Sequence, residues 1–146
     1  MEQRVKIHEA QSAAWKAMYN FSISISNSVL TPIQKELIKI RASQINSCAY
    51  CINMHTEEAL KIGETQQRIF LISAWRETDL FTPEEKAILA LTEEVTLIHD
   101  KGVSDATYKE AEQFFNSEAI AEIIIAITVI NSWNRIAVST RLPIGH

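Results

Sequence analysis

The sequence has 146 residues, and its 14 basic and 18 acidic side chains give a formal net charge of −4 at pH 7. This length fits one ordinary domain, and the 47% share of hydrophobic residues is enough for a sizeable core. The composition excludes collagen-like, low-complexity and disulfide-scaffold proteins, and the acidic balance gives no broad attraction for nucleic acid or anionic lipid. We therefore expect a single domain over residues 1–146, with neither nucleic acid nor a membrane as its partner.

The scarcity of turn-forming residues indicates an all-α fold. The sequence holds three glycines and three prolines, too few for the many tight turns of a sandwich or barrel. The first residues show no apolar stretch after their charges and do not resemble a secretory signal. We therefore expect a cytoplasmic, helical protein.

Two helices are predicted in the first third of the chain. Apolar residues recur at mostly helical spacing from Val5 to Phe21, after which isoleucines alternate with serines and could continue in extended form. The run Thr-Pro-Ile-Gln at residues 31–34 combines a capping Thr, a Pro at the first helical position and a Gln that can reach back to the cap. It predicts a helix from Pro32 to about Ile45.

A break at Asn46-Ser47 separates this helix from the next one. Ser47 is expected to cap a helix that Gly63 ends, because Ser favours the position before a helix and Gly the position after it. A short helix that includes Ile69 and Trp75 follows.

Capping residues also divide the second half of the chain. The run Thr-Pro-Glu-Glu at residues 82–85 repeats the earlier pattern and predicts a helix to about His99. Ser104 is expected to start a helix that runs through Phe114, and Ser117 to cap the last one.

The longest apolar stretch, Ala119 to Trp133, is predicted to be a buried core helix. It contains Glu122 and Asn131 and falls short of the roughly 20 residues needed to cross a bilayer. Its many β-branched residues would also suit a strand. Its length, with Ala and Glu interspersed, favours the helix.

The chemically most informative residues are Cys48, Cys51 and His55. Steps of three and four residues place all three on one face of a helix, where two thiols can react and a base lies within reach. The free amides and the positive dipole end of a helix would stabilise a thiolate, which is the working nucleophile. Because the cytosol keeps most thiols reduced, this spacing suggests a redox site and not a structural disulfide.

Inert, metal-binding and haem-binding roles of the cysteine pair have less support. The cysteines could be inert core residues, or Cys48, Cys51 and His55 could bind zinc, although a structural zinc site usually has four ligands and no second ligand pair is visible. Haem attachment requires C-x-x-C-H, and position 52 is Ile52. A thioredoxin fold would surround the motif with strands. We expect no cofactor and no bound metal.

The run Glu36-x11-Cys48-x-Tyr50-Cys51-x3-His55 resembles the core of the AhpD-like alkylhydroperoxidase branch of the carboxymuconolactone decarboxylase family. Further similarity lies at residues 75–77 and in the late run at residues 131–135, Asn-Ser-Trp-Asn-Arg. The resemblance implies an all-helical subunit that assembles into trimers or hexamers. Decarboxylase members share the helical fold but lack the paired thiols, so both cysteines together favour the peroxidase branch.

The resemblance also implies roles for individual residues. Cys51 corresponds to the peroxidatic thiol that becomes a sulfenic acid, and Cys48 to its proton donor and resolving partner. Glu36 and His55 correspond to the proton relay that activates the pair, while Tyr50 matches a motif position with a supporting role. From the residues alone, the stronger readings are a solvated first-turn acid for Glu36 and a core histidine with satisfied hydrogen bonds for His55.

The expected function is that of a thiol-dependent peroxidase, or alkyl hydroperoxide reductase, with a peroxide substrate and an external dithiol reductant. One alternative is a decarboxylase-like lyase that acts on a small cyclic acid through His55 and Glu36, whose activity would survive replacement of the cysteines. Another is a zinc-binding or redox-sensing module, which stoichiometric zinc would identify.

The first and last helices together carry more apolar surface than so small a chain readily buries, which predicts a homo-oligomer. Within the late run, Arg135 is expected to form a buried salt bridge or an interface contact.

Overall fold

The computed structural model describes residues 2–25 and 28–144, and within these ranges every regular element is a helix. This confirms the predicted all-α class. In chain order the elements are α1 (Ile7–Ala10), α2 (Ser12–Ser24), α3 (Pro32–Ile45), α4 (Ala49–Lys61), α5 (Gln66–Leu71), the 3-10 helix η1 (Ile72–Glu77), α6 (Pro83–Thr96), α7 (Asp105–Glu112) and α8 (Ser117–Thr140).

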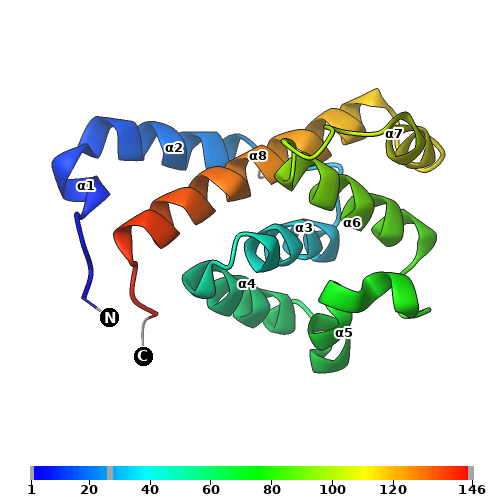
Figure 1. Cartoon of the computed structure of the whole chain (residues 1–146), viewed down its shortest axis with the longest axis horizontal. Coiled ribbons are helices and arrows are strands. Elements are labelled where there is room, and N and C mark those ends of the chain that lie inside the picture. Colours follow the sequence, from blue (N-terminus) through cyan, green and yellow to red (C-terminus); the bar gives the residue numbers. More distant parts are fainter. Residues whose placement is uncertain (1, 26–27, 145–146) are drawn as a thin grey trace.

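Helix α3 forms the centre of the fold and packs against α4, α6 and α8 (Figure 1). Its start is fixed by a complete capping box, in which the Gln34 amide donates to the Thr31 hydroxyl at 3.2 Å and the Thr31 amide donates to the Gln34 side chain at 2.9 Å. The predicted bounds Pro32 to Ile45 are confirmed.

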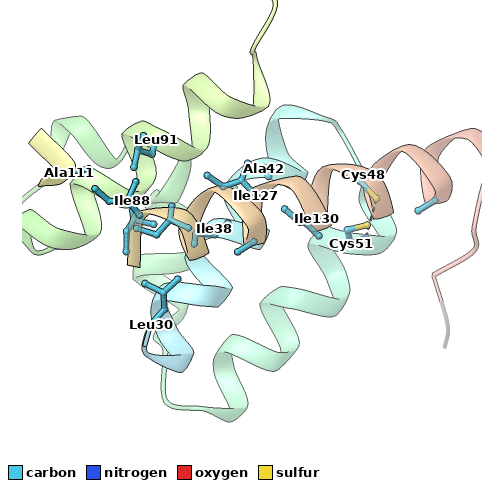
Figure 2. Close-up of a cluster of buried hydrophobic side chains, with 14 residues drawn as sticks. Leu30, Ile38, Ala42, Cys48, Cys51, Ile88, Leu91, Ala111, Ile127 and Ile130 are labelled. Atoms are coloured by element: carbon cyan, nitrogen blue, oxygen red, sulfur yellow. Dashed lines mark hydrogen bonds between the residues drawn. The ribbon is translucent and has the colours of Figure 1, made fainter. Parts of the chain in front are cut away.

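Two clusters of buried side chains lie on different faces of α3. One joins α3 to α6 and α8 through residues such as Ile38, Ile88 and Ile127, and it includes both cysteines (Figure 2). The other joins α3 to α5, η1 and α6 and includes Leu37 and Trp75. The cysteine motif is thus built directly onto the hydrophobic core, which holds it rigidly.

Helix α8 is longer than the apolar stretch in the sequence suggested, because the polar residues that flank this stretch continue the helix. Its 24 residues include an 18-residue stretch with a mean hydropathy of 1.3, so by length and composition the helix could cross a membrane. Within that stretch, 44% is buried inside the protein. This is weak evidence for a membrane span, because core helices pass the same test. Ile120, Ile123, Ile127 and Ile130 recur on its buried face, as expected for a core helix.

The N-terminal segment differs from the prediction. The predicted first helix is interrupted at Gln11. Helix α2 continues to Ser24, although the sequence after Phe21 would also allow an extended form. Helix α2 runs beside α8 (Figure 1) and is held there by Trp133, whose indole donates to the Ser22 hydroxyl at 2.7 Å and meets the Trp15 ring edge-on at 4.9 Å. None of the residues of α2 is buried.

Two helix boundaries also differ from the prediction. Helix α6 ends at Thr96 and not near His99. Asn116, not Ser117, caps α8, since its side-chain oxygen accepts the Ala119 amide at 2.9 Å. Asn and Ser are comparable caps, so the choice between neighbouring positions depends on the incoming chain.

Candidate functional site

The two cysteines lie at the start of α4, where the chain turns sharply out of α3. Ser47 adopts a left-handed conformation with φ 53°, and the Cys48 amide donates to the Ser43 carbonyl at 2.9 Å. The predicted capping role of Ser47 is wrong, because this turn places the Cys48 side chain in the capping position. The Cys48 sulfur accepts the Cys51 amide at 3.4 Å, drawn as the dashed line in Figure 2.

Both thiols are free and deeply buried, with Cys48 1% and Cys51 2% exposed. The hydrogen bond from the Cys51 thiol, assisted by the Cys51 amide and Asn134 and opposed by burial, lowers the pKa of Cys48 to about 7. Donating that hydrogen bond, together with burial, raises the pKa of Cys51 above its ordinary value, although Asn134 acts in the opposite direction. Cys48 is therefore the thiol of the pair that ionises first.

The predicted partners Glu36 and His55 meet across the α3–α4 hairpin. The Glu36 carboxylate lies 2.9 Å from His55 Nδ1, and both side chains are buried. Its other oxygen accepts from the Lys39 ammonium group at 2.6 Å. Burial acts to raise the pKa of Glu36, but the His55 hydrogen bond and the Lys39 charge outweigh it and lower that pKa below its ordinary value. Glu36 is therefore a charged group that orients the His55 ring, and not a solvated surface acid.

The connection between this pair and the thiols is less direct. His55 lies on the same buried face of α4 as Cys51, as the spacing predicts, but within the described residues it forms no hydrogen bond to either sulfur. Tyr50 is half-buried and packs against the cluster that contains the cysteines. Four of the five predicted residues thus form the two hydrogen-bonded pairs Cys48–Cys51 and Glu36–His55, and Tyr50 packs against the cluster that holds the cysteines.

A group of polar side chains that the sequence did not reveal lies behind the cysteines. Asn134 of α8 is 1% exposed, donates to the Ser43 hydroxyl at 2.9 Å and acts to lower the pKa of both thiols. It is linked in turn to Asn46 and, through it, to Asn131. Two asparagines three residues apart in an otherwise apolar helix were the available signal, since buried amides need partners. The salt bridge that was one of the two expectations for Arg135 is not found among the described residues. The Arg135 guanidinium donates to the Asn131 carbonyl and side chain instead.

A metal site has little structural support. Among the described residues, no group of three or more His, Cys, Asp or Glu side chains is arranged to hold a metal ion. The geometry instead suits nucleophilic thiol chemistry, because it joins a stabilised thiolate, a second thiol and a carboxylate-oriented imidazole.

Comparison with known proteins is consistent with this arrangement. The model of the carboxymuconolactone decarboxylase family matches residues 11–94, a segment that contains the motif from Glu36 to His55. The uncharacterized protein YdfG of Bacillus subtilis is 43% identical over 139 residues, which cover 95% of each chain.

Two solved structures share the fold. A protein of unknown function from Agrobacterium tumefaciens, described as a candidate antioxidant defence protein AhpD, superimposes with a TM-score of 0.96 at 36% identity over 99% of both chains. An uncharacterized peroxidase-related protein from Ralstonia eutropha, described as an alkylhydroperoxidase AhpD core, has a TM-score of 0.82 at 18% identity, over 94% of this chain and 74% of the other, and supports the fold alone. With the family model, the relatives and the site motif in agreement, the chain belongs to the carboxymuconolactone decarboxylase family and has the AhpD-like fold.

Proposed function

We propose that this protein is a thiol-dependent peroxidase that reduces hydroperoxides with the Cys48–Cys51 pair. The observation that carries the proposal is the pair of free, buried sulfurs at the start of α4, where the Cys48 sulfur accepts the Cys51 amide, next to the Glu36–His55 pair. The similarity to AhpD-related structures supports the same chemistry.

In the proposed mechanism Cys51 attacks the peroxide and Cys48 is its immediate base. The charge first resides on Cys48, which hydrogen-bonds to the Cys51 thiol. Transfer of the Cys51 thiol proton to the Cys48 thiolate creates the attacking Cys51 thiolate, one helical turn from His55. The initial location of the charge on Cys48 is therefore compatible with a peroxidatic Cys51, since only one short proton transfer separates the two forms.

Atoms and electrons balance in each step. The Cys51 thiolate attacks one peroxide oxygen, the O–O bond breaks, and Cys51 becomes a sulfenic acid while Cys48 gives its proton to the departing alkoxide. The Cys48 thiolate then attacks the Cys51 sulfur, forms the disulfide and displaces hydroxide, which takes a proton from a protonated His55 and leaves as water. An external dithiol reduces the disulfide by thiol exchange and returns both protons. The expected compartment is the cytoplasm, which keeps such reductants available.

The proposal is tested by peroxide consumption with dithiothreitol as the probe reductant. The wild type should turn over repeatedly, whereas Cys51→Ser should lose turnover. Cys48→Ser lacks the base and the resolving thiol, so it should react more slowly and, without dithiothreitol, leave a sulfenic acid that dimedone traps on Cys51. A protein with both cysteines replaced by Ser that consumes peroxide as fast as the wild type would contradict the proposal. Trapping only on Cys48, in Cys51→Ser, would reverse the two roles.

A further inference from the structure

A chain of hydrogen-bonded amides leads from the surface of α8 to the cysteine pair. We call Asn131, Asn46 and Asn134 the amide ladder. The Asn46 Nδ2 group donates to Asn131 Oδ1 and to Asn134 Oδ1, both at 2.9 Å. Arg135 closes the outer end by donating to Asn131 Oδ1 at 3.1 Å. At the inner end, Asn134 Nδ2 donates to the Ser43 hydroxyl at 2.9 Å.

The direction of the ladder is fixed at Asn131. An arginine can only donate hydrogen bonds and a backbone carbonyl can only accept them. The atom of Asn131 that faces Arg135 must therefore be the oxygen, and the atom that faces the Ile127 carbonyl at 2.9 Å must be the nitrogen. The same nitrogen also donates to the Thr96 hydroxyl at 3.0 Å, so all four hydrogen-bonding positions of the Asn131 amide are used.

This direction is transmitted through Asn46 to Asn134. Because Asn131 presents its oxygen, Asn46 must present its nitrogen, and the second hydrogen of that nitrogen requires an acceptor from Asn134. The Asn134 oxygen is thus turned toward Asn46 and its nitrogen toward Ser43. Ser43 also holds the backbone of Cys48, whose amide donates to the Ser43 carbonyl at 2.9 Å.

One N–H of Asn134 remains after the bond to the Ser43 hydroxyl, and Ser43 in turn holds the Cys48 amide. The Asn134 side chain acts to lower the pKa of both thiols, as an N–H donor beside the sulfurs would. We propose that Asn134 is a thiolate-stabilising residue, and that Arg135, Asn131 and Asn46 are positioning residues that keep its N–H donor turned toward the Cys48–Cys51 pair. This inference deepens the proposed function, on which it rests for its purpose.

The chemistry of the site gives the ladder a defined effect. A buried N–H donor favours a thiolate over a neutral thiol, which is a weak hydrogen-bond acceptor. Among the ionisable groups of the surrounding helices are Glu36 of α3, which bonds to His55 and Lys39, and Arg135 of α8, which acts through the ladder. Reversal of the Asn134 amide would place an oxygen against the sulfurs and favour protonation.

The test is the pH titration of thiolate ultraviolet absorbance, a measurement that needs neither peroxide nor access of a reagent to the buried sulfurs. Asn134→Leu is nearly isosteric and removes the donor without adding charge. Asn46→Asp leaves Asn134 intact, but it replaces the Nδ2 group that donates to Asn131 and Asn134 by a carboxylate oxygen, which can only accept. Asn131 cannot rotate, so Asn134 must turn its nitrogen toward residue 46 and its oxygen toward Ser43 and the sulfurs.

We expect each variant to lower the thiolate fraction near neutral pH about tenfold, as expected for the loss of one hydrogen bond to a charged group. Full thiolate absorbance should return at higher pH, and circular dichroism shows that each variant keeps its fold. In a protein that already carries Asn134→Leu, Asn46→Asp should shift the thiolate titration further only by the effect of its added negative charge. Asn53→Asp is the charge control, because Asn53 lies on α4 with its side chain bonded to Glu57. It should shift the titration far less.

Unchanged titrations in folded Asn134→Leu and Asn46→Asp would overturn the inference, as would an equal shift in Asn53→Asp. If the variants do not fold, the wild type itself provides the answer, because the Asn134 side-chain amide resonances must move with the thiol titration in a ¹⁵N-labelled sample. Asn134 side-chain amide resonances whose chemical shifts stay constant during the thiol titration would also overturn the inference. These measurements follow thiol ionisation alone. They can therefore contradict the inference about Asn134 without contradicting the proposed peroxidase function, and a failed peroxidase assay would leave the inference intact.

Discussion

At the scale of single residues, the unusual feature is a helix capped by a sulfur. The Cys48 side chain accepts the Cys51 amide where helices ordinarily use an oxygen. A thiolate accepts hydrogen bonds better than a thiol does, so ionisation of Cys48 and capping of α4 favour each other. The folded pKa lies below the ordinary thiol value, so this contribution to stability is fully present above about pH 8.5 and is lost as pH falls through about 7.

The thiol of Cys51 should control the ionisation of Cys48. Cys51→Ala removes the S–H donor and should raise the pKa of Cys48 above its wild-type value of about 7. Cys51→Ser supplies a hydroxyl donor in the same place and should restore part of the effect. The measurement is the pH midpoint of Cys48 alkylation in the three proteins. An identical midpoint in all three, or a higher one for Ser than for Ala, would show that the side-chain bond does not set the ionisation.

The Glu36–His55 pair should affect turnover in a graded way. His55→Ala should lower kcat/KM for peroxide by roughly 100-fold, the lower range for loss of an acid–base group, while Glu36→Gln should cost less because an amide still orients the ring. Tyr50→Phe should have a smaller effect than His55→Ala, since a phenol is a poor base at neutral pH.

The control for these variants is Glu57→Gln, which removes a carboxylate of α4 that bonds only locally to Asn53. Circular dichroism identifies any loss of fold. If His55→Ala and Glu36→Gln both match the control in rate, the pair has a structural role only.

At the scale of elements, local chemistry made some boundaries predictable and left others open. The starts of α3 and α6 follow from their Thr-Pro capping boxes, which involve only neighbouring residues. The left-handed turn at Ser47 was not predictable, because no glycine marks it and its conformation follows from how α3 and α4 pack. The interruption at Gln11 likewise has no local signal that distinguishes it from a continuous helix.

The capping box of α6 should contribute measurably to stability. In it the Glu85 amide donates to the Thr82 hydroxyl at 3.3 Å and the Thr82 amide donates to Glu85 at 2.9 Å. Thr82→Ala should lower the free energy of unfolding by about 1 kcal/mol in urea titrations. Thr128→Ala is the matched control on the exposed side of α8, where alanine favours the helix and should cost nothing. Equal losses in the two variants would contradict the capping assignment.

At the scale of the whole molecule, the sequence predicted the site only where its partners share a local motif. Glu36 and His55 come from adjacent helices, and the resemblance to the family motif paired them before the structure did. Asn134 lies on α8, far along the chain, and its place behind the cysteines depends on how α8 crosses α3 and α4. Such a contact exists only after the core has assembled, so no local pattern could have revealed the direction of the amide ladder.

The surface of α2 continues to support the prediction of a homo-oligomer. None of its residues is buried, and Tyr19 and Ile23 are 56% and 50% exposed on this helix. Exposed apolar surface of this kind is typical of an interface. Sedimentation at micromolar concentration should give a trimer or hexamer, and Ile23→Glu should shift it toward smaller species. A wild-type monomer at that concentration would contradict the prediction.

The central claim is that Cys48 and Cys51 are the two electron donors to a peroxide. Its most direct test is mass spectrometry of the reduced wild type after one equivalent of hydrogen peroxide, followed by alkylation under denaturing conditions. We predict the mass of the internal Cys48–Cys51 disulfide, with neither cysteine alkylated. After reduction with dithiothreitol, both cysteines should be alkylated. Consumption of the peroxide with both cysteines still fully alkylated would contradict the claim.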